Sequence, residues 1–192
     1  MTWDPFGTLQ KALWIGGAPW TGKSTVARLL AERHGLTTYH HDDRARPGTP
    51  LPDDLPAGDQ LTAMMAEFGN RFRCALDDLR ALTSPRPIVA EGRGLRPELV
   101  APLVDSPGRM VVLVPTELFR QHQLRHLPDG PAIPEQRTRL TRDRMLAAHA
   151  VRAARDLGIR VIEIDGKLDP TGVTDVVAEH FHAYLDFEVS ER

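Results

Sequence analysis

A short glycine-rich stretch, residues 16–25, combines a flexible backbone with one lysine and several hydroxyl side chains in GGAPWTGKST. The spacing of glycine, four residues, glycine, lysine and serine is met by Gly17, Gly22, Lys23 and Ser24. Glycines allow backbone N–H groups to turn inward on phosphate oxygens, and a helix that begins at the lysine adds its partial positive charge. The stretch therefore predicts binding of a nucleoside triphosphate.

The predicted roles within this stretch follow from side-chain chemistry. Lys23 can reach the β- and γ-phosphates, and the Ser24 hydroxyl is a hard oxygen ligand that suits Mg²⁺. The alternative is a glycine-rich turn with an incidental lysine, but a strand-like run precedes the motif and a helical pattern follows it. The predicted nucleotide contacts form one continuous run: Gly17, Ala18, Pro19, Trp20, Thr21, Gly22, Lys23, Ser24 and Thr25.

Carboxylates and an arginine follow two other apolar runs. Asp42 and Asp43 come soon after residues 37–39, and Glu91 and Arg93 follow residues 88–90. Ligands of open α/β sheets gather at the carboxyl ends of strands, so these side chains are expected near the glycine-rich stretch. Glu91 could hold Mg²⁺ through water, and Arg93 could bind an anionic or hydroxylated acceptor. The alternatives are a helix-capping aspartate and a solvated arginine.

The elements that must position these residues are visible as alternating patterns. Five apolar, partly β-branched runs could be buried strands: 12–15, 37–39, 88–90, 110–114 and 160–164. Helical patterns lie between and after them at 23–34, 61–82, 97–104, 116–126, 137–157 and 171–186. This alternation predicts an α/β fold with a parallel sheet covered on both faces. The proline- and glycine-rich segments 44–59 and 127–136 are predicted surface loops.

Composition narrows the class of protein. The 192 residues are 41% hydrophobic and 26% charged, which fits one globular domain. The net charge of -2 gives no reason to expect a nucleic-acid partner, and no apolar run approaches the roughly 18 residues of a membrane span. Cys74 is the only cysteine, and the first residues lack the pattern of a secretion signal. We therefore expect a cytoplasmic monomer or homodimer with no nucleic-acid or membrane partner.

The glycine-rich motif, the chain length, the strand–helix alternation and the two loop segments together resemble the small P-loop kinases, the group of shikimate, gluconate and nucleoside monophosphate kinases. The resemblance covers nearly the whole chain in outline, while residues 17–25 match a specific motif. It implies a P-loop NTPase three-layer α/β fold with a five-stranded parallel sheet. It also implies ATP and Mg²⁺ as cofactors and transfer of the γ-phosphoryl group to a hydroxyl of a small-molecule acceptor.

The same resemblance implies how the chain is divided and which residues act. Residues 1–192 would form one kinase domain, with an acceptor-binding insertion at about 44–82 and a mobile lid at about 120–144. In gluconate and shikimate kinases the second member of an aspartate-x-aspartate pair contacts the acceptor hydroxyl. His40 occupies the first place here, so Asp42 matches, and Asp43 is the alternative if the register differs by one residue. The implied site residues are Lys23 and Asp42 for catalysis, Asp42, Asp43 and Arg93 for the acceptor, and Ser24 and Glu91 for the metal.

Six arginines lie on both sides of the second proline-rich loop, at positions 120, 125, 137, 139, 142 and 144. The resemblance makes this region a lid that supplies arginines to the negative charge developing during transfer. Arg139 and Arg142 are the predicted catalytic arginines because they lie just beyond the loop. The alternative is a solvated helix face that pairs with nearby acidic residues.

Two other functions are alternatives. A nucleotide or nucleoside kinase uses the same chemistry, but the chain has GKST and AEGRGL where adenylate kinases usually have glycine-lysine-glycine-threonine and aspartate-glycine-phenylalanine-proline-arginine. A nucleotide-binding switch or ATPase is less well supported, because no asparagine-lysine-x-aspartate stretch is present. The histidine pairs His40, His41 and His122, His126 lack a third ligand at metal-binding spacing and are interpreted as surface or packing residues.

Overall fold

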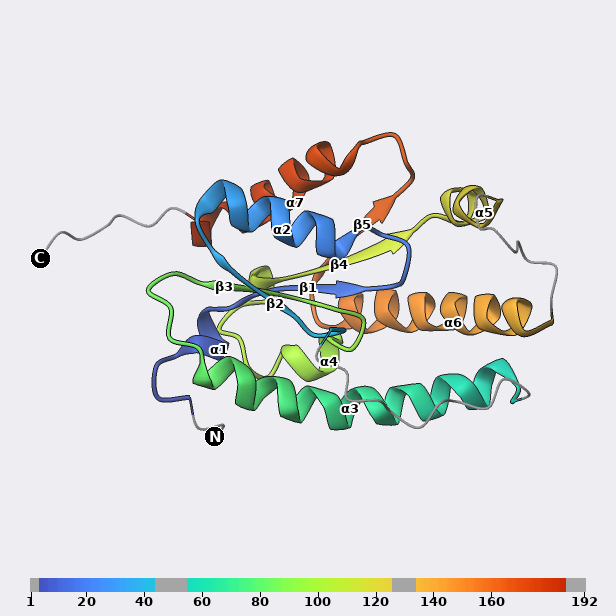
Figure 1. Ribbon diagram of the computed structural model, residues 1–192, viewed down its shortest axis with the longest axis horizontal. Helices are drawn as coiled ribbons and strands as arrows, with labels where there is room; N and C mark the ends of the chain where they lie inside the picture. The colour runs from blue at the N-terminus through green and yellow to red at the C-terminus, as the bar shows by residue number, and fades with distance from the viewer. Residues whose placement is uncertain (1–3, 44–54, 126–133, 186–192) are drawn as a thin grey trace, which may run out of the picture.

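A five-stranded sheet runs through the centre of the molecule (Figure 1). The structure is a computed structural model that describes residues 4–43, 55–125 and 134–185. The strands are β1 (Leu13–Gly17), β2 (Thr37–His40), β3 (Ile88–Glu91), β4 (Met110–Pro115) and β5 (Arg160–Ile164). All neighbours pair in parallel, in the order β2-β3-β1-β4-β5. The sequence predicted each strand to within two residues of its observed ends.

Helices cover both faces of this sheet (Figure 1). One face carries α2 (Lys23–His34) and α7 (Pro170–Leu185), and the other carries α3 (Ala57–Ala81), α4 (Pro97–Val100) and α6 (Pro134–Asp156). The short helix α1 (Thr8–Lys11) precedes β1, and α5 (Glu117–Arg125) follows β4. This arrangement confirms the predicted three-layer α/β fold.

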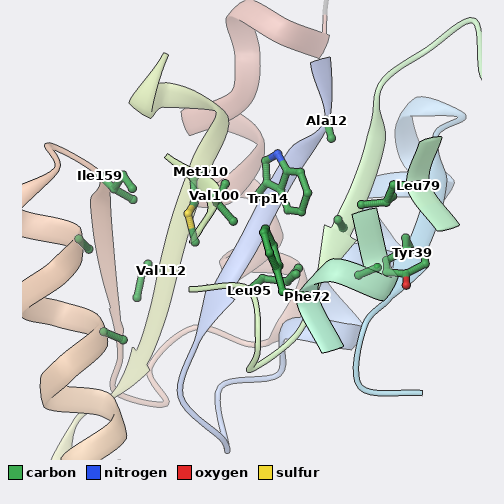
Figure 2. Close-up of a cluster of buried hydrophobic side chains, with 14 of the residues drawn as sticks. Ala12, Trp14, Tyr39, Phe72, Leu79, Leu95, Val100, Met110, Val112 and Ile159 are labelled. Atoms are coloured by element: carbon green, nitrogen blue, oxygen red, sulfur yellow. The ribbon is translucent and has the colours of Figure 1, made fainter. Parts of the chain in front are cut away.

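Residues of the sheet point alternately into the two helical layers. Along β1, Leu13 and Ile15 pack with the cluster beneath α2 and α7, whereas Trp14 packs with the cluster beneath α3 and α6. Figure 2 shows the cluster beneath α3 and α6. The ring centroids of Trp14 and Phe72 in this cluster lie 6.2 Å apart. Because every β1 residue is buried, the strand is fixed from both sides, and the loop after it starts from a rigid position.

Three short elements differ from the sequence prediction. α4 ends at Val100 rather than at residue 104, because Pro102 lacks the N–H that a further helical turn requires. α1 and a 3₁₀ turn at Pro107–Arg109 are absent from the prediction. α1 is too short to show an apolar period, and its start is instead fixed by Asp4, whose carboxylate accepts from the Thr8 N–H at 2.9 Å.

Parts of two predicted regions lie outside the described residues. These parts are residues 44–54 of the acceptor-binding insertion and residues 126–133 of the lid. Most of the remaining insertion forms α3, and the remaining lid forms α5 and the first part of α6. In the portion of the chain that the structure describes, no helix has both the length and the apolar character to span a membrane.

Candidate active site

Three neighbouring strands end at the same edge of the sheet, and predicted site residues follow each of them. The parallel register places His40 of β2 beside Glu91 of β3, and Glu91 beside Ile15 of β1. The pairing continues beyond the strands, because the Gly92 N–H donates to the Ile15 carbonyl at 3.2 Å. The glycine-rich loop, the Asp42 segment and the Glu91 segment therefore meet at this edge.

The loop after β1 lies against β4 and turns sharply into α2. Gly17 has a φ of 121°, and a Cβ atom there would lie 2.0 Å from the Leu113 carbonyl oxygen, so only glycine fits. The Ala18 N–H donates to the same oxygen at 3.0 Å. Trp20, with a φ of 72°, and Gly22, with a φ of 74°, both have left-handed backbones. The loop thus carries backbone strain, and the first N–H groups of α2 lack a carbonyl partner within the helix.

Lys23 is a buried cation at the start of α2, with 6% of its surface exposed. Its Nζ donates to the Ala18 carbonyl at 2.6 Å and to the Thr21 hydroxyl at 3.3 Å. Burial lowers the pKa of Lys23 to about 8, although the charges of Asp42 and Glu91 act in the opposite direction. The ammonium therefore lies inside the loop in a setting that favours an additional negative charge beside it.

Ser24, Glu91 and His40 form a connected polar group beside the loop. The Ser24 hydroxyl donates to Glu91 Oε1 at 3.0 Å, and His40 Nδ1 lies 2.9 Å from the same oxygen. Glu91 is 2% exposed, so this carboxylate depends on these two partners in place of water. The group offers a hydroxyl and a carboxylate at one point, which are hard oxygen ligands for a cation.

Asp42 is held by both the backbone and the side chain of Arg93. Arg93 Nε donates to Asp42 Oδ2 at 3.1 Å, and the Arg93 N–H lies 3.3 Å from each carboxylate oxygen. Burial opposes ionisation of this carboxyl, but the hydrogen bond from His41 and the charges of Arg93 and Lys23 outweigh it and hold the pKa of Asp42 well below its usual range. Asp42 is therefore a carboxylate throughout the neutral pH range, while Asp43 is exposed.

A cavity of about 390 Å³ brings these groups together. Its lining comprises seven consecutive residues of the loop and the start of α2, together with four side chains from elsewhere: Pro19, Trp20, Thr21, Gly22, Lys23, Ser24, Thr25, Asp42, Glu91, Arg93 and Arg139. Asp43 and Arg142 are not among the lining residues. Arg142 instead donates to Asp143 Oδ1 at 3.0 Å and to Gln60 Oε1 at 3.3 Å, which directs its guanidinium toward α3.

His40, the last residue of β2, and His41, which follows it, make contacts that the sequence did not predict. His40 contacts Glu91, and His41 is 2% exposed with its Nδ1 3.4 Å from Asp42 Oδ1. His40 lies opposite Glu91 in the parallel register of β2 against β3, which only the paired strands reveal. His126 lies outside the described residues. Among the residues that are described, no group of three or more histidine, cysteine, aspartate or glutamate side chains is arranged to hold a metal ion.

Comparison with known proteins gives matches at the level of structure. No protein-family model matches the sequence, and no curated protein does. A shikimate kinase from Aquifex aeolicus is 17% identical, with 90% of this chain and 96% of that chain covered and a TM-score of 0.50. A gluconokinase from Sinorhizobium meliloti is 18% identical, with 92% of each chain covered and a TM-score of 0.47. At this level of identity the likeness to the shikimate kinase shows a shared fold, which is the predicted fold of the small P-loop kinases.

Proposed function

We propose that this protein is an ATP-dependent phosphotransferase that moves the γ-phosphoryl group of ATP to a hydroxyl of a small-molecule acceptor. One observation carries the proposal: the glycine-rich loop shares its cavity with Asp42, Arg93 and Arg139. Phosphoryl transfer to a second molecule requires a group that orients the incoming hydroxyl and cations that stabilise the developing charge. The cavity has both, within reach of the loop that would hold the nucleotide.

The residues around the loop fit Mg²⁺ and a triphosphate. Ser24 and Glu91 present two hard oxygen atoms 3.0 Å apart, and Mg²⁺ prefers such ligands and completes its shell with phosphate and water. Ser24 would hold the ion directly and Glu91 through water. When bound, the ion would offset negative charge on the β- and γ-phosphates. Lys23 Nζ and the first N–H groups of α2 supply the positive charge and donors that phosphate oxygens require.

Asp42 is suited to orient the acceptor. Each carboxylate oxygen can accept more than one hydrogen bond, so an acceptor hydroxyl can donate to Asp42 without displacing Arg93. The hydroxyl oxygen then attacks the γ-phosphorus. As the new O–P bond forms, the hydroxyl proton passes to Asp42, and the bond from the γ-phosphorus to the bridging oxygen of ADP breaks.

Arg139 has a different role from Arg93 in this proposal. Arg93 already binds Asp42 and so lies on the acceptor side of the cavity. Arg139 is exposed, lines the same cavity from α6, and has no described hydrogen-bond partner that would compete for it. It is therefore the arginine best placed to meet the charge that develops on the transferred group.

The test is a search for the acceptor followed by a transfer assay. Thermal shift would be measured for sugars, nucleosides, nucleotides, aminoglycosides and shikimate in the presence of a nonhydrolysable ATP analogue and Mg²⁺. Shikimate is included because a shikimate kinase shares the fold. Compounds that stabilise the protein would then be tested for acceptor-dependent formation of ADP and of a phosphorylated product.

Lys23→Met provides the control for this assay, since it removes the ammonium and keeps a side chain of similar length. The proposal expects acceptor-dependent ADP formation by the wild type and nearly none by this variant. If the wild type binds the nucleotide but no acceptor in a broad panel accelerates ADP formation, the protein is a nucleotide-binding switch or an ATPase instead.

A further inference from the structure

His41 is fixed at the junction between β2 and the candidate site. Its backbone N–H donates to the Glu91 carbonyl at 2.9 Å, and its own carbonyl accepts from Arg71 of α3 at 3.4 Å. The side chain is 1% exposed, whereas histidine is on average only intermediate in burial. The residue is thus held between β3 and α3, directly before Asp42.

Two glycines form a seat for the His41 ring. A Cβ atom on Gly94 would lie 2.2 Å from His41 Cε1 and 3.0 Å from each ring nitrogen. A Cβ atom on Gly92 would lie 2.7 Å from His41 Cβ and 3.3 Å from Asp42 Oδ1. Real Cβ atoms essentially never come within 3.0 Å of another side-chain atom, so a side chain at either position would displace His41. Glycine at positions 92 and 94 therefore leaves the space that the His41 side chain occupies.

The Asp42 carboxylate is held from two sides. Arg93 Nε binds Oδ2 at 3.1 Å, and His41 Nδ1 lies 3.4 Å from Oδ1. The Arg93 backbone N–H lies 3.3 Å from both oxygens and so does not distinguish them. His41 Nδ1 is the only side-chain donor to Oδ1 that the structure describes, and together with Arg93 Nε on Oδ2 it fixes which oxygen faces which side chain. The ring must carry its proton on Nδ1 to make this contact.

The other ring nitrogen argues against a purely structural role. His41 Nε2 is buried and has no hydrogen-bond partner among the described residues. An apolar side chain of similar size would fill the same space without leaving a polar atom unpaired, so packing alone does not account for an imidazole. The nitrogen that does have a partner faces Asp42.

We propose that His41 is a positioning residue that sets the orientation of the Asp42 carboxylate, with Gly92 and Gly94 as the seat for its ring. The proposal rests on the proposed function for its catalytic consequence, since an oriented Asp42 aligns the acceptor hydroxyl. Its structural consequence, an ordered contact between Asp42 and Arg93, is independent of any acceptor.

A matched pair of substitutions tests which ring nitrogen matters. The amide nitrogen of asparagine lies near the position of histidine Nδ1, and that of glutamine lies near Nε2. His41→Asn therefore keeps the donor to Asp42, whereas His41→Gln keeps more of the volume and moves the donor. His41→Leu keeps the volume without any donor. A role in packing alone predicts that Gln and Leu are tolerated better than Asn.

The readout without an acceptor is the NMR signal of the Arg93 Nε–H group, assigned with Arg93→Lys. We expect a protected signal in the wild type and in His41→Asn, and a weakened or fast-exchanging signal in His41→Gln and His41→Leu. Equal protection in Gln and Asn would overturn the proposal, and this result does not require any kinase activity. If His41→Leu does not fold, the Asn and Gln variants still decide the question.

The kinetic readout uses whichever acceptor the transfer assay identifies. His41→Gln should lower kcat by about 10- to 100-fold, the range expected when a reacting group is misplaced, with nucleotide affinity within about twofold of wild type. His41→Asn should restore most of kcat. Gly94→Ala should lower kcat as His41→Gln does. The control is Gly158→Ala, where an added Cβ meets nothing within 4 Å and the left-handed backbone makes the substitution strained outside the cavity, and it should leave kcat unchanged. Wild-type kcat in Gly94→Ala would refute the role of the seat.

Discussion

Lys23 combines two requirements that conflict in a folded protein. A cation must be ready inside the loop to meet phosphate oxygens, yet burial without a phosphate is unfavourable for an ammonium group. The lowered pKa of about 8 expresses this cost, and the contacts with Ala18 and Thr21 reduce it only in part. The free protein therefore holds Lys23 at the expense of its own stability.

Replacement of Lys23 should accordingly separate stability from function. Lys23→Met removes a buried charge and keeps an unbranched side chain, so we expect the ligand-free protein to gain about 1–3 kcal/mol in free energy of unfolding at pH 7. Phosphotransfer should fall to nearly zero. Urea denaturation and the transfer assay measure the two effects. A variant that is destabilised, or that transfers phosphate at the wild-type rate, would show that the loop is misassigned.

The same residue predicts a pH dependence of nucleotide binding. Below about pH 8 the Lys23 ammonium is charged in the free protein, so affinity for MgATP should not depend on its titration. Above this pH, binding requires proton uptake, because bound phosphate favours the charged form, and affinity should fall by up to about tenfold per pH unit. Calorimetric titrations between pH 7 and 9.5 test this expectation. Lys23→Met should show no such fall.

Asp42 and Asp43 are adjacent but have different surroundings, which makes them an internal comparison. Asp42→Asn keeps the volume and removes the charge, so acceptor-dependent turnover should fall by roughly 10²–10⁴-fold with little change in nucleotide affinity. Asp43→Asn should have little effect, because Asp43 is exposed and does not line the cavity. Steady-state kinetics of both variants decide between them. The reverse outcome would assign the role to Asp43, and two active variants would make Glu91 the next carboxylate to test.

At the scale of elements, the sequence allowed the strands and the loop to be predicted but not the contacts between strand ends. Buried parallel strands appear as continuous apolar runs, so their positions are readable one strand at a time. The contact of His40 with Glu91 depends on the register of β2 against β3, which no local pattern encodes. The position of Arg142 likewise depends on how α6 packs on α3, since Gln60 of α3 accepts one of its hydrogen bonds.

The packing of α6 on α3 gives the two predicted catalytic arginines different surroundings, since Arg139 lines the cavity and Arg142 contacts α3. Arg139→Ala should lower kcat by about 10²-fold and leave the free energy of unfolding almost unchanged, because the side chain is exposed and lines the cavity. Arg142→Ala should instead destabilise the protein by about 1–3 kcal/mol, since it leaves the buried carboxylate of Asp143 without its described donor. Kinetics and urea denaturation on both variants provide the test.

Arg152→Ala is the control for this pair, because Arg152 is an exposed arginine later in the same helix. It should change neither kcat nor stability. If Arg142→Ala lowers kcat at unchanged stability, Arg142 reaches the transferred group in the complex, and the contacts with Gln60 and Asp143 belong to the ligand-free state alone.

At the scale of the whole molecule, the two helical layers depend on one sheet. Alternate residues of β1 and β4 belong to opposite clusters, with Trp14 and Val112 beneath α3 and α6, and Ile15 and Leu113 beneath α2 and α7. If one helical layer left the sheet, one face of β1 and β4 would be exposed to water. The same strands also carry the residues on which the other layer packs, so that layer would lose its support. The described residues should therefore unfold as one cooperative unit.

A substitution in one layer should report this coupling in the other. Phe181 of α7 is fully buried in the cluster beneath α2 and α7, and Phe181→Ala should lower the free energy of unfolding by about 3–5 kcal/mol. Trp14 lies in the opposite cluster, so in a Trp3→Phe, Trp20→Phe background its fluorescence reports the layer that Phe181 does not contact. With one cooperative unit, the fluorescence midpoint in urea moves down together with the midpoint from circular dichroism. A fluorescence midpoint that stays in place while the circular dichroism midpoint moves would show that the layers unfold separately, and the sheet would then not transmit stability from one face to the other.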